Sequence, residues 1–132
     1  MSEYSVTILQ DQAIVLLELT GTVTLSVLLE VAEGVYAHAD YRPEFSAVID
    51  QRHANFELNY EDLYSYLYQI NENPNRLQGD TVFVTEKSLG FGMARMYENM
   101  ESDEFADKIF FAETVEEAFN LLANRRDQRV TK

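Results

Sequence analysis

The residues best suited to acid–base chemistry lie in one short polar stretch. Asp50 ends an apolar run and is followed by Arg52, His53 and Glu57. Open α/β sheets bind ligands beyond the carboxyl ends of their strands, and histidine exchanges protons near neutral pH. No serine or cysteine accompanies the histidine to form a nucleophilic triad. Two interpretations stay open: an acid–base group, or a solvated loop in which Asp50 caps turns and Arg52 forms an ion pair.

A second candidate is the glycine-bearing segment 88–92, between an expected strand and an expected helix. Free amides at a helix start can hold an anion. The segment is not a Walker motif, because it lacks Gly-Lys-Ser/Thr. One interpretation is that its glycines let the helix pack closely on the strand. The other is that a small anionic or apolar ligand, which could be lipid-like, binds between the second and third helices. The side chains that would hold this ligand are Arg52, Lys87, Ser88 and Arg95.

The third candidate is a row of aromatic side chains. Tyr60, Tyr64 and Tyr68 are spaced i, i+4, i+8, which places them on one side of an expected helix. They flank the apolar stripe that would face the core. Tyrosines suit interfaces because they bury a large area yet tolerate partial wetting. The row is either a surface for a partner or for self-association, or a flank of the core whose hydroxyl groups reach water.

Composition excludes several classes of protein. Ten Lys and Arg against 23 Asp and Glu give a net charge of −13, which argues against nucleic acids and anionic membrane surfaces as partners. The absence of cysteine removes disulfides, thiolate metal sites and cysteine nucleophiles. With only two histidines, we expect no metal site and no cofactor. Without a signal peptide or an apolar run of membrane-spanning length, we expect a cytoplasmic protein with no membrane span.

The elements that must position these residues alternate along the chain. Hydrophobic periodicity predicts strands and helices in the order β-β-α-β-α-β-α-β-α. Crossover connections make the later strands parallel, so we expect a mixed five-stranded α/β sheet with an antiparallel hairpin at its start and four helices. The expected strands are 4–9, 13–19, 45–50, 81–85 and 108–112. The expected helices follow Thr24, Asn59, Thr114 and the glycine-bearing segment.

Local signals mark the helix boundaries. Thr24 and Asn59 are predicted N-caps, and Thr114 with Glu117 forms a predicted capping box. Gly34, inside the first helix, is expected to mark a close approach to the sheet, since glycine there costs about 1 kcal/mol relative to alanine. A short basic tail is expected to fray from about residue 125. The whole chain, 1–132, is expected to be one domain.

This order resembles the STAS domain of anti-sigma-factor antagonists, and within it a set of small, mostly uncharacterised bacterial proteins. The resemblance spans nearly the whole chain and is carried by Val48-Ile49-Asp50, Val82-Phe83-Val84, Leu89 to Tyr97, Ile109-Phe110-Phe111 and Thr114 to Phe119. It implies a domain that docks on a partner protein and is switched off when a serine at the start of the second helix is phosphorylated. No serine or threonine lies between Ala47 and Asp62, so that switch is expected to be absent.

Together these features predict a non-enzymatic interaction or regulatory module. It would bind another protein, or itself, through the second helix and the segment before it. The residues expected to contact the partner are Arg52, Asn59, Tyr60, Tyr64 and Tyr68. The alternative remains a binder of the small anionic or apolar ligand described above.

Overall fold

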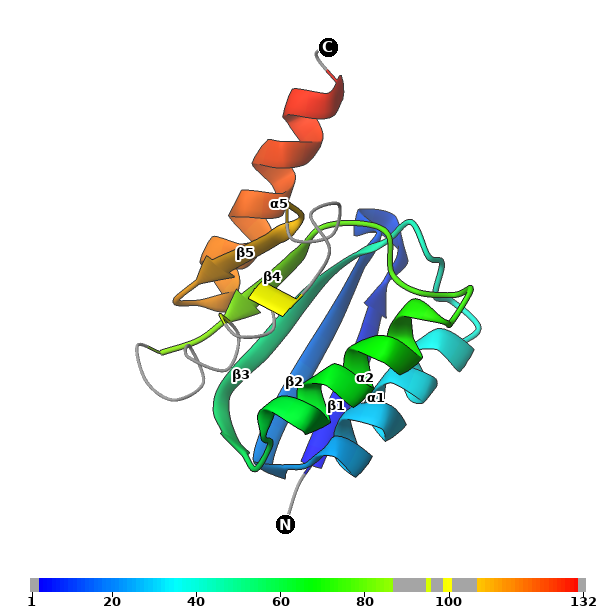
Figure 1. Ribbon diagram of the computed structural model, residues 1–132. Helices are drawn as coiled ribbons and strands as arrows, with labels where there is room; N and C mark the ends of the chain where they lie inside the picture. Colours follow the sequence, from blue (N-terminus) through cyan, green and yellow to red (C-terminus); the bar gives the residue numbers. More distant parts are fainter. Residues whose placement is uncertain (1–2, 87–94, 96–98, 101–106, 131–132) are drawn as a thin grey trace.

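A single mixed sheet organises the protein. The computed structural model describes residues 3–86, 95, 99–100 and 107–130, with side chains to residue 126 (Figure 1). Among these residues the strands pair in chain order, β1 antiparallel to β2 and the rest parallel, which confirms the predicted five-stranded α/β sheet. The strands are β1 (Glu3–Leu9), β2 (Ile14–Val23), β3 (Ser46–Phe56), β4 (Thr81–Val84) and β5 (Ile109–Ala112).

Helices cover both faces of the sheet. α1 (Leu25–Ala37) and α2 (Tyr60–Asn71) lie side by side on one face, whereas α5 (Val115–Val130) packs on the other against β3, β4 and β5 (Figure 1). A short 3-10 turn, Gln10–Gln12, closes the predicted β1–β2 hairpin. The predicted third helix falls largely outside the described residues.

The core has two layers because the central strands are covered on both sides. Val48, Val82 and Val84 are fully buried and pack with Ala118 and Leu122 of α5. The side chains between them point to the opposite face, where Ala47 and Ile49 pack with buried residues of α1. Strands buried on both faces need apolar residues at successive positions, which explains the continuous run predicted as the second strand.

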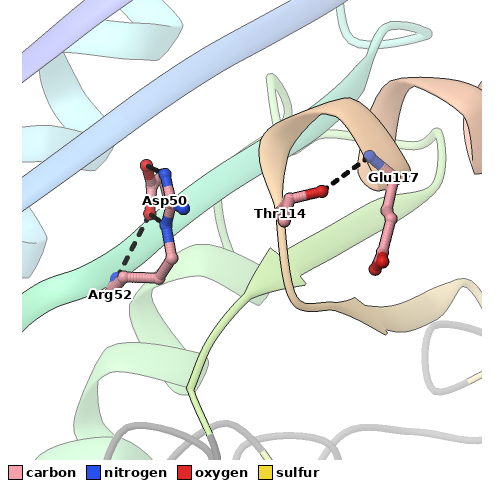
Figure 2. Close-up of polar contacts among 4 residues, drawn as sticks. All are labelled: Asp50, Arg52, Thr114 and Glu117. Carbon is pink, nitrogen blue, oxygen red and sulfur yellow. Dashed lines mark hydrogen bonds and ion pairs between the residues drawn. The ribbon is translucent and has the colours of Figure 1, made fainter.

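Local side-chain bonds start the helices as predicted, with one difference. Thr24 and Asn59 accept hydrogen bonds from first-turn amides. Thr114 Oγ1 accepts from the Glu117 amide at 3.1 Å (Figure 2). The Glu117 carboxylate accepts from the amide of Glu113 at 3.0 Å rather than from the Thr114 amide. The box therefore reaches one residue further back than the sequence pattern predicts.

The C-terminal segment is helical beyond the point where the sequence predicts a tail. α5 continues to Val130, past residue 125 where the basic tail was expected to begin. Arg125 Nε donates to Asp80 Oδ2 at 2.9 Å, and its guanidinium carbon lies 4.2 Å from the centre of the Phe110 ring. Asp80 is only 1% exposed. A contact with a residue 45 positions earlier thus anchors the end of the helix.

Two glycines differ in the space around them. Gly34 is exposed, and a Cβ there would meet only the Tyr4 hydroxyl at 3.8 Å, an ordinary contact, so the predicted close approach to the sheet is wrong. Gly79 is crowded, because a Cβ there would lie 2.4 Å from the Phe45 carbonyl oxygen and 2.8 Å from Ser46 Oγ. Only glycine fits at position 79 without a shift of backbone.

Candidate functional site

Strand β3 is longer than predicted, and this changes the setting of the polar stretch. Residues 51–56, expected as a connection, continue the strand and pair with β2 up to Val23 and Phe56. Across from Leu19 of β2 stand two residues of β3, Gln51 and Arg52, which form a β-bulge. Polar side chains are tolerated at this bulge because the backbone pairing between β3 and β4 ends at Asp50.

Asp50 and Arg52 form a two-pronged ion pair beside the bulge (Figure 2). Arg52 Nε donates to Asp50 Oδ1 and Arg52 Nη2 to Asp50 Oδ2, both at 2.9 Å, and the Arg52 amide also donates to Oδ1 at 3.2 Å. These bonds outweigh burial and hold the pKa of Asp50 below its usual value. They also raise the pKa of Arg52.

The expected ion pair of Arg52 is present, but both of its residues lie on a strand rather than in a solvated loop. Both carboxylate oxygens of Asp50 accept hydrogen bonds from Arg52, and Asp50 is 6% exposed. His53 is exposed on the same strand, and Glu57 is exposed just after it. The two bonds to Asp50 fix the position of the Arg52 guanidinium.

The three tyrosines of α2 project from the protein. Tyr60, Tyr64 and Tyr68 are 62%, 64% and 62% exposed, whereas the stripe of Leu63 and Leu67 on the same helix is buried. Most of each ring surface is wet, which is unusual for side chains with such large apolar area. The predicted aromatic row is thus a feature of the molecular surface, and its use as a partner site stays a prediction.

Asn59 shapes the start of this helix. Its Oδ1 accepts from the Asp62 amide at 2.8 Å, and its own amide donates to Asp62 Oδ2 at 3.1 Å, a complete capping box. The side-chain oxygen of Asn59 is therefore engaged within the protein. We infer that Asn59 orients the first turn of α2, on which Tyr60 stands.

The grouping of the residues predicted to hold an anion stays a prediction, because only two of the four belong to the described part of the structure. Lys87 and Ser88 lie outside it, as does most of the predicted third helix. Arg95 is exposed, with its guanidinium carbon 5.4 Å from the centre of the Phe111 ring. Arg52 forms an ion pair with Asp50.

A cavity that sequence reasoning missed lies between the sheet and the two helices α1 and α2. Its volume is about 140 Å³. Its described lining is mainly apolar, with side chains from β2, β3, α1 and α2, and includes neither Arg52 nor Arg95. Two buried polar residues, Gln51 (4% exposed) and Arg76 (7% exposed), also line it. The sequence carried no signal for it, because a cavity depends on how well distant side chains fill the space between layers.

Two further properties follow from the described residues alone. Among them, no group of three or more His, Asp or Glu side chains is arranged to hold a metal ion. Within the same part of the chain, no helix is long and apolar enough to cross a membrane.

Comparison with known proteins supports the fold. No protein-family model matches the chain, and no curated protein matches it. A solved structure is similar over 92% of this chain and 95% of its own, with a TM-score of 0.61 and 16% sequence identity. It is an uncharacterised protein from the DUF3478 family with a SpoIIAA-like fold, from Shewanella loihica PV-4. The chain therefore has a STAS-like, SpoIIAA-like fold, as the resemblance implied; at this identity the similarity shows the fold alone.

Proposed function

We propose that this protein is a non-enzymatic interaction module of STAS-like type, working in the cytoplasm and docking on another protein, or on itself, through α2 and the end of β3. The observation that carries the proposal is the row of Tyr60, Tyr64 and Tyr68, each more than 60% exposed on one helix. Burying such rings against a partner removes apolar area from water at little cost in side-chain entropy. Arg52 is a separate contact residue in this proposal, because its partner Asp50 shares a strand face with Val48, which packs against α5.

The absence of serine and threonine between Ala47 and Asp62 supports docking without the phosphorylation switch that the resemblance implies. Phosphorylation switches binding by adding charge to an interface. Binding here would instead depend on the amounts of the module and its partner.

Site-specific photo-cross-linking tests the proposal. A photoreactive phenylalanine analogue at position 64 is expected to capture a partner in cells, whereas the same analogue at Asn120, exposed on α5, is expected not to. Tyr64→Ser should then reduce capture from position 68 while leaving the free energy of unfolding within about 0.5 kcal/mol, because the side chain is exposed. Equal capture at 64 and 120, or turnover of a metabolite by the purified protein, would contradict the proposal.

The cavity favours a second candidate, a small ligand with an apolar body and an anionic group. A volume of about 140 Å³ is close to that of an apolar cavity that accepts benzene. Arg76 is a buried cation in its wall and would attract a carboxylate.

A thermal-shift comparison of benzoate, benzene and benzylamine tests this candidate. At a hundred times its dissociation constant, a ligand stabilises the folded state by about 2.7 kcal/mol. We expect benzoate to raise the melting temperature more than benzene or benzylamine does. Benzoate should raise that of Arg76→Gln less, each shift being measured relative to the same protein without ligand. Equal thermal shifts from benzoate and benzylamine would contradict the proposal that the ligand carries an anionic group.

A further inference from the structure

The cavity between the sheet and the helices α1 and α2 is a slender space. On β2 its floor runs from Val15 to Leu19, about 13 Å at about 3.3 Å per residue. At one end it also reaches across the sheet to Ile109 of β5, about 14 Å at about 4.8 Å per strand. A volume of about 140 Å³ shared among side chains so far apart leaves room for a chain rather than for a compact ring.

One end of this cavity is cationic. The parallel register aligns a row of lining residues that marks this end on four strands: Val15, Ala47, Thr81 and Ile109. Lys108 comes directly before Ile109, and Arg76 lies in the connection that leads into β4. The Lys108 ammonium donates to the carbonyl of Gln78 at 3.0 Å, two residues after Arg76. The two cationic residues of the described lining therefore lie at the same end.

The opposite end is apolar. Its described lining comes from β2, β3, α1 and the start of α2: Leu19, Leu28, Phe56, Leu58 and Leu63. Leu28 and Phe56 pack against the cluster that holds Leu19. Gln51, across from Leu19 at the β-bulge, is polar but carries no charge. A ligand with one anionic group thus meets opposite charge at one end of the cavity and apolar side chains at the other.

We propose that the cavity binds a straight-chain carboxylic acid, with the carboxylate at the end that holds Arg76 and Lys108 and the chain running toward Leu19. This inference rests on the second candidate function and gives its ligand a shape and an orientation. A guanidinium group carries five N–H donors and an ammonium group three, so each can bond a ligand in addition to its contacts within the protein. Asp80, in the segment that holds Arg76, bonds to Arg125 of α5, so its carboxylate is directed to the other face of the sheet (Figure 1).

The volume of the cavity limits the length of the chain. An apolar cavity of about 150 Å³ accepts benzene, a ring of six carbons, so about 140 Å³ holds a chain of about six to eight carbons. Each methylene group buried within that length should raise the affinity about three- to fourfold. Methylene groups beyond that length should add nothing, because they stay in water.

The first test measures the binding of simple acids to the full-length protein by isothermal titration calorimetry. Butanoate, hexanoate, octanoate and decanoate vary the chain, and octan-1-ol and octylamine replace the head group. We expect the affinity to rise up to octanoate and then to level off, with the alcohol and the amine at least about fivefold weaker than octanoate. Heptanoate should bind more tightly than cyclohexanecarboxylate, which has as many carbons but carries most of them in a ring. Equal affinity for octanoate and octylamine, or tighter binding of the ring acid, would overturn the inference.

Matched variants locate the two ends of the bound acid. Arg76→Gln and Lys108→Gln should each weaken hexanoate and octanoate by one common factor, about three- to tenfold. Arg126→Gln, at an exposed cation on α5, should change neither. Leu28→Phe fills the apolar end, so it should weaken octanoate and spare butanoate, and Leu58→Phe serves the same purpose if the first variant does not fold. Equal weakening of both acids by these phenylalanine variants, or an effect of Arg126→Gln as large as that of Lys108→Gln, would refute the orientation.

The same titrations separate this inference from the second candidate function. Tighter binding of heptanoate than of cyclohexanecarboxylate and benzoate supports both. Binding of the two ring acids as tight as that of heptanoate overturns the straight chain and leaves a compact anionic ligand standing. Absence of binding by every acid overturns both.

Discussion

Removing the cation of the Asp50–Arg52 pair should destabilise the fold and alter its dependence on pH. In Arg52→Met, Asp50 keeps its buried position but loses the two 2.9 Å bonds that hold it ionised. Bonds to charged groups contribute about 1.5–3 kcal/mol each, and breaking a fully buried pair costs about 3–5 kcal/mol. The Arg52 side chain is 30% exposed, so water replaces part of the loss. We expect a decrease of about 1–3 kcal/mol in the free energy of unfolding at neutral pH.

The pH dependence has a defined sign. The pKa of Asp50 is lowered from 3.8 in the folded state, so the stability it contributes is present above that value and is lost as the pH falls through the lower, folded-state pKa. The gap between wild type and Arg52→Met should therefore be largest near neutral pH and should shrink below about pH 4.

Urea titrations at several pH values, followed by circular dichroism, measure this gap. Arg42→Met is a suitable control, because it also removes a guanidinium group, but one whose bonds go to the backbone carbonyls of Ala39 and Tyr41. Its effect should not vary with pH over the range in which Asp50 titrates. A loss below about 0.5 kcal/mol for Arg52→Met, or a gap that stays constant down to about pH 2, would refute the reasoning.

Three stability measurements test other parts of the fold. Gly79→Ala should lower the free energy of unfolding by about 1–3 kcal/mol, because the new methyl group meets backbone atoms. Gly34→Ala should raise it by about 0.5–1 kcal/mol, because Gly34 is exposed within a helix. A change of the same sign for both variants in urea titrations would contradict this. Asn59→Ala should cost about 1 kcal/mol through the lost cap of α2, with Asn59→Asp retaining most of it in thermal melts. Arg125→Met should cost about 1–3 kcal/mol by leaving the buried Asp80 without this partner; faster hydrogen exchange confined to the end of α5, with no loss of global stability, would argue against that.

Sequence reasoning worked best where the determining contacts are local. The caps at Thr24, Asn59 and Thr114 depend on bonds between residues a few positions apart, and the structure contains each of them. The exposed tyrosine row follows from helical periodicity in the same way. The length of β3 was missed because its polar residues suggested a loop, whereas pairing with the far end of β2 keeps them extended.

The sequence by itself determined the alternation of strands and helices, the helix boundaries set by capping, and the net negative charge, since each depends on neighbouring residues or on composition. Tertiary structure alone decided three other features: the bulge that sets Asp50 beside Arg52, the contact of Arg125 with Asp80, and the cavity behind α1 and α2. These depend on register and packing between segments distant in the chain. Periodicity shows which face of an element is apolar, but not which residues of another element will meet it.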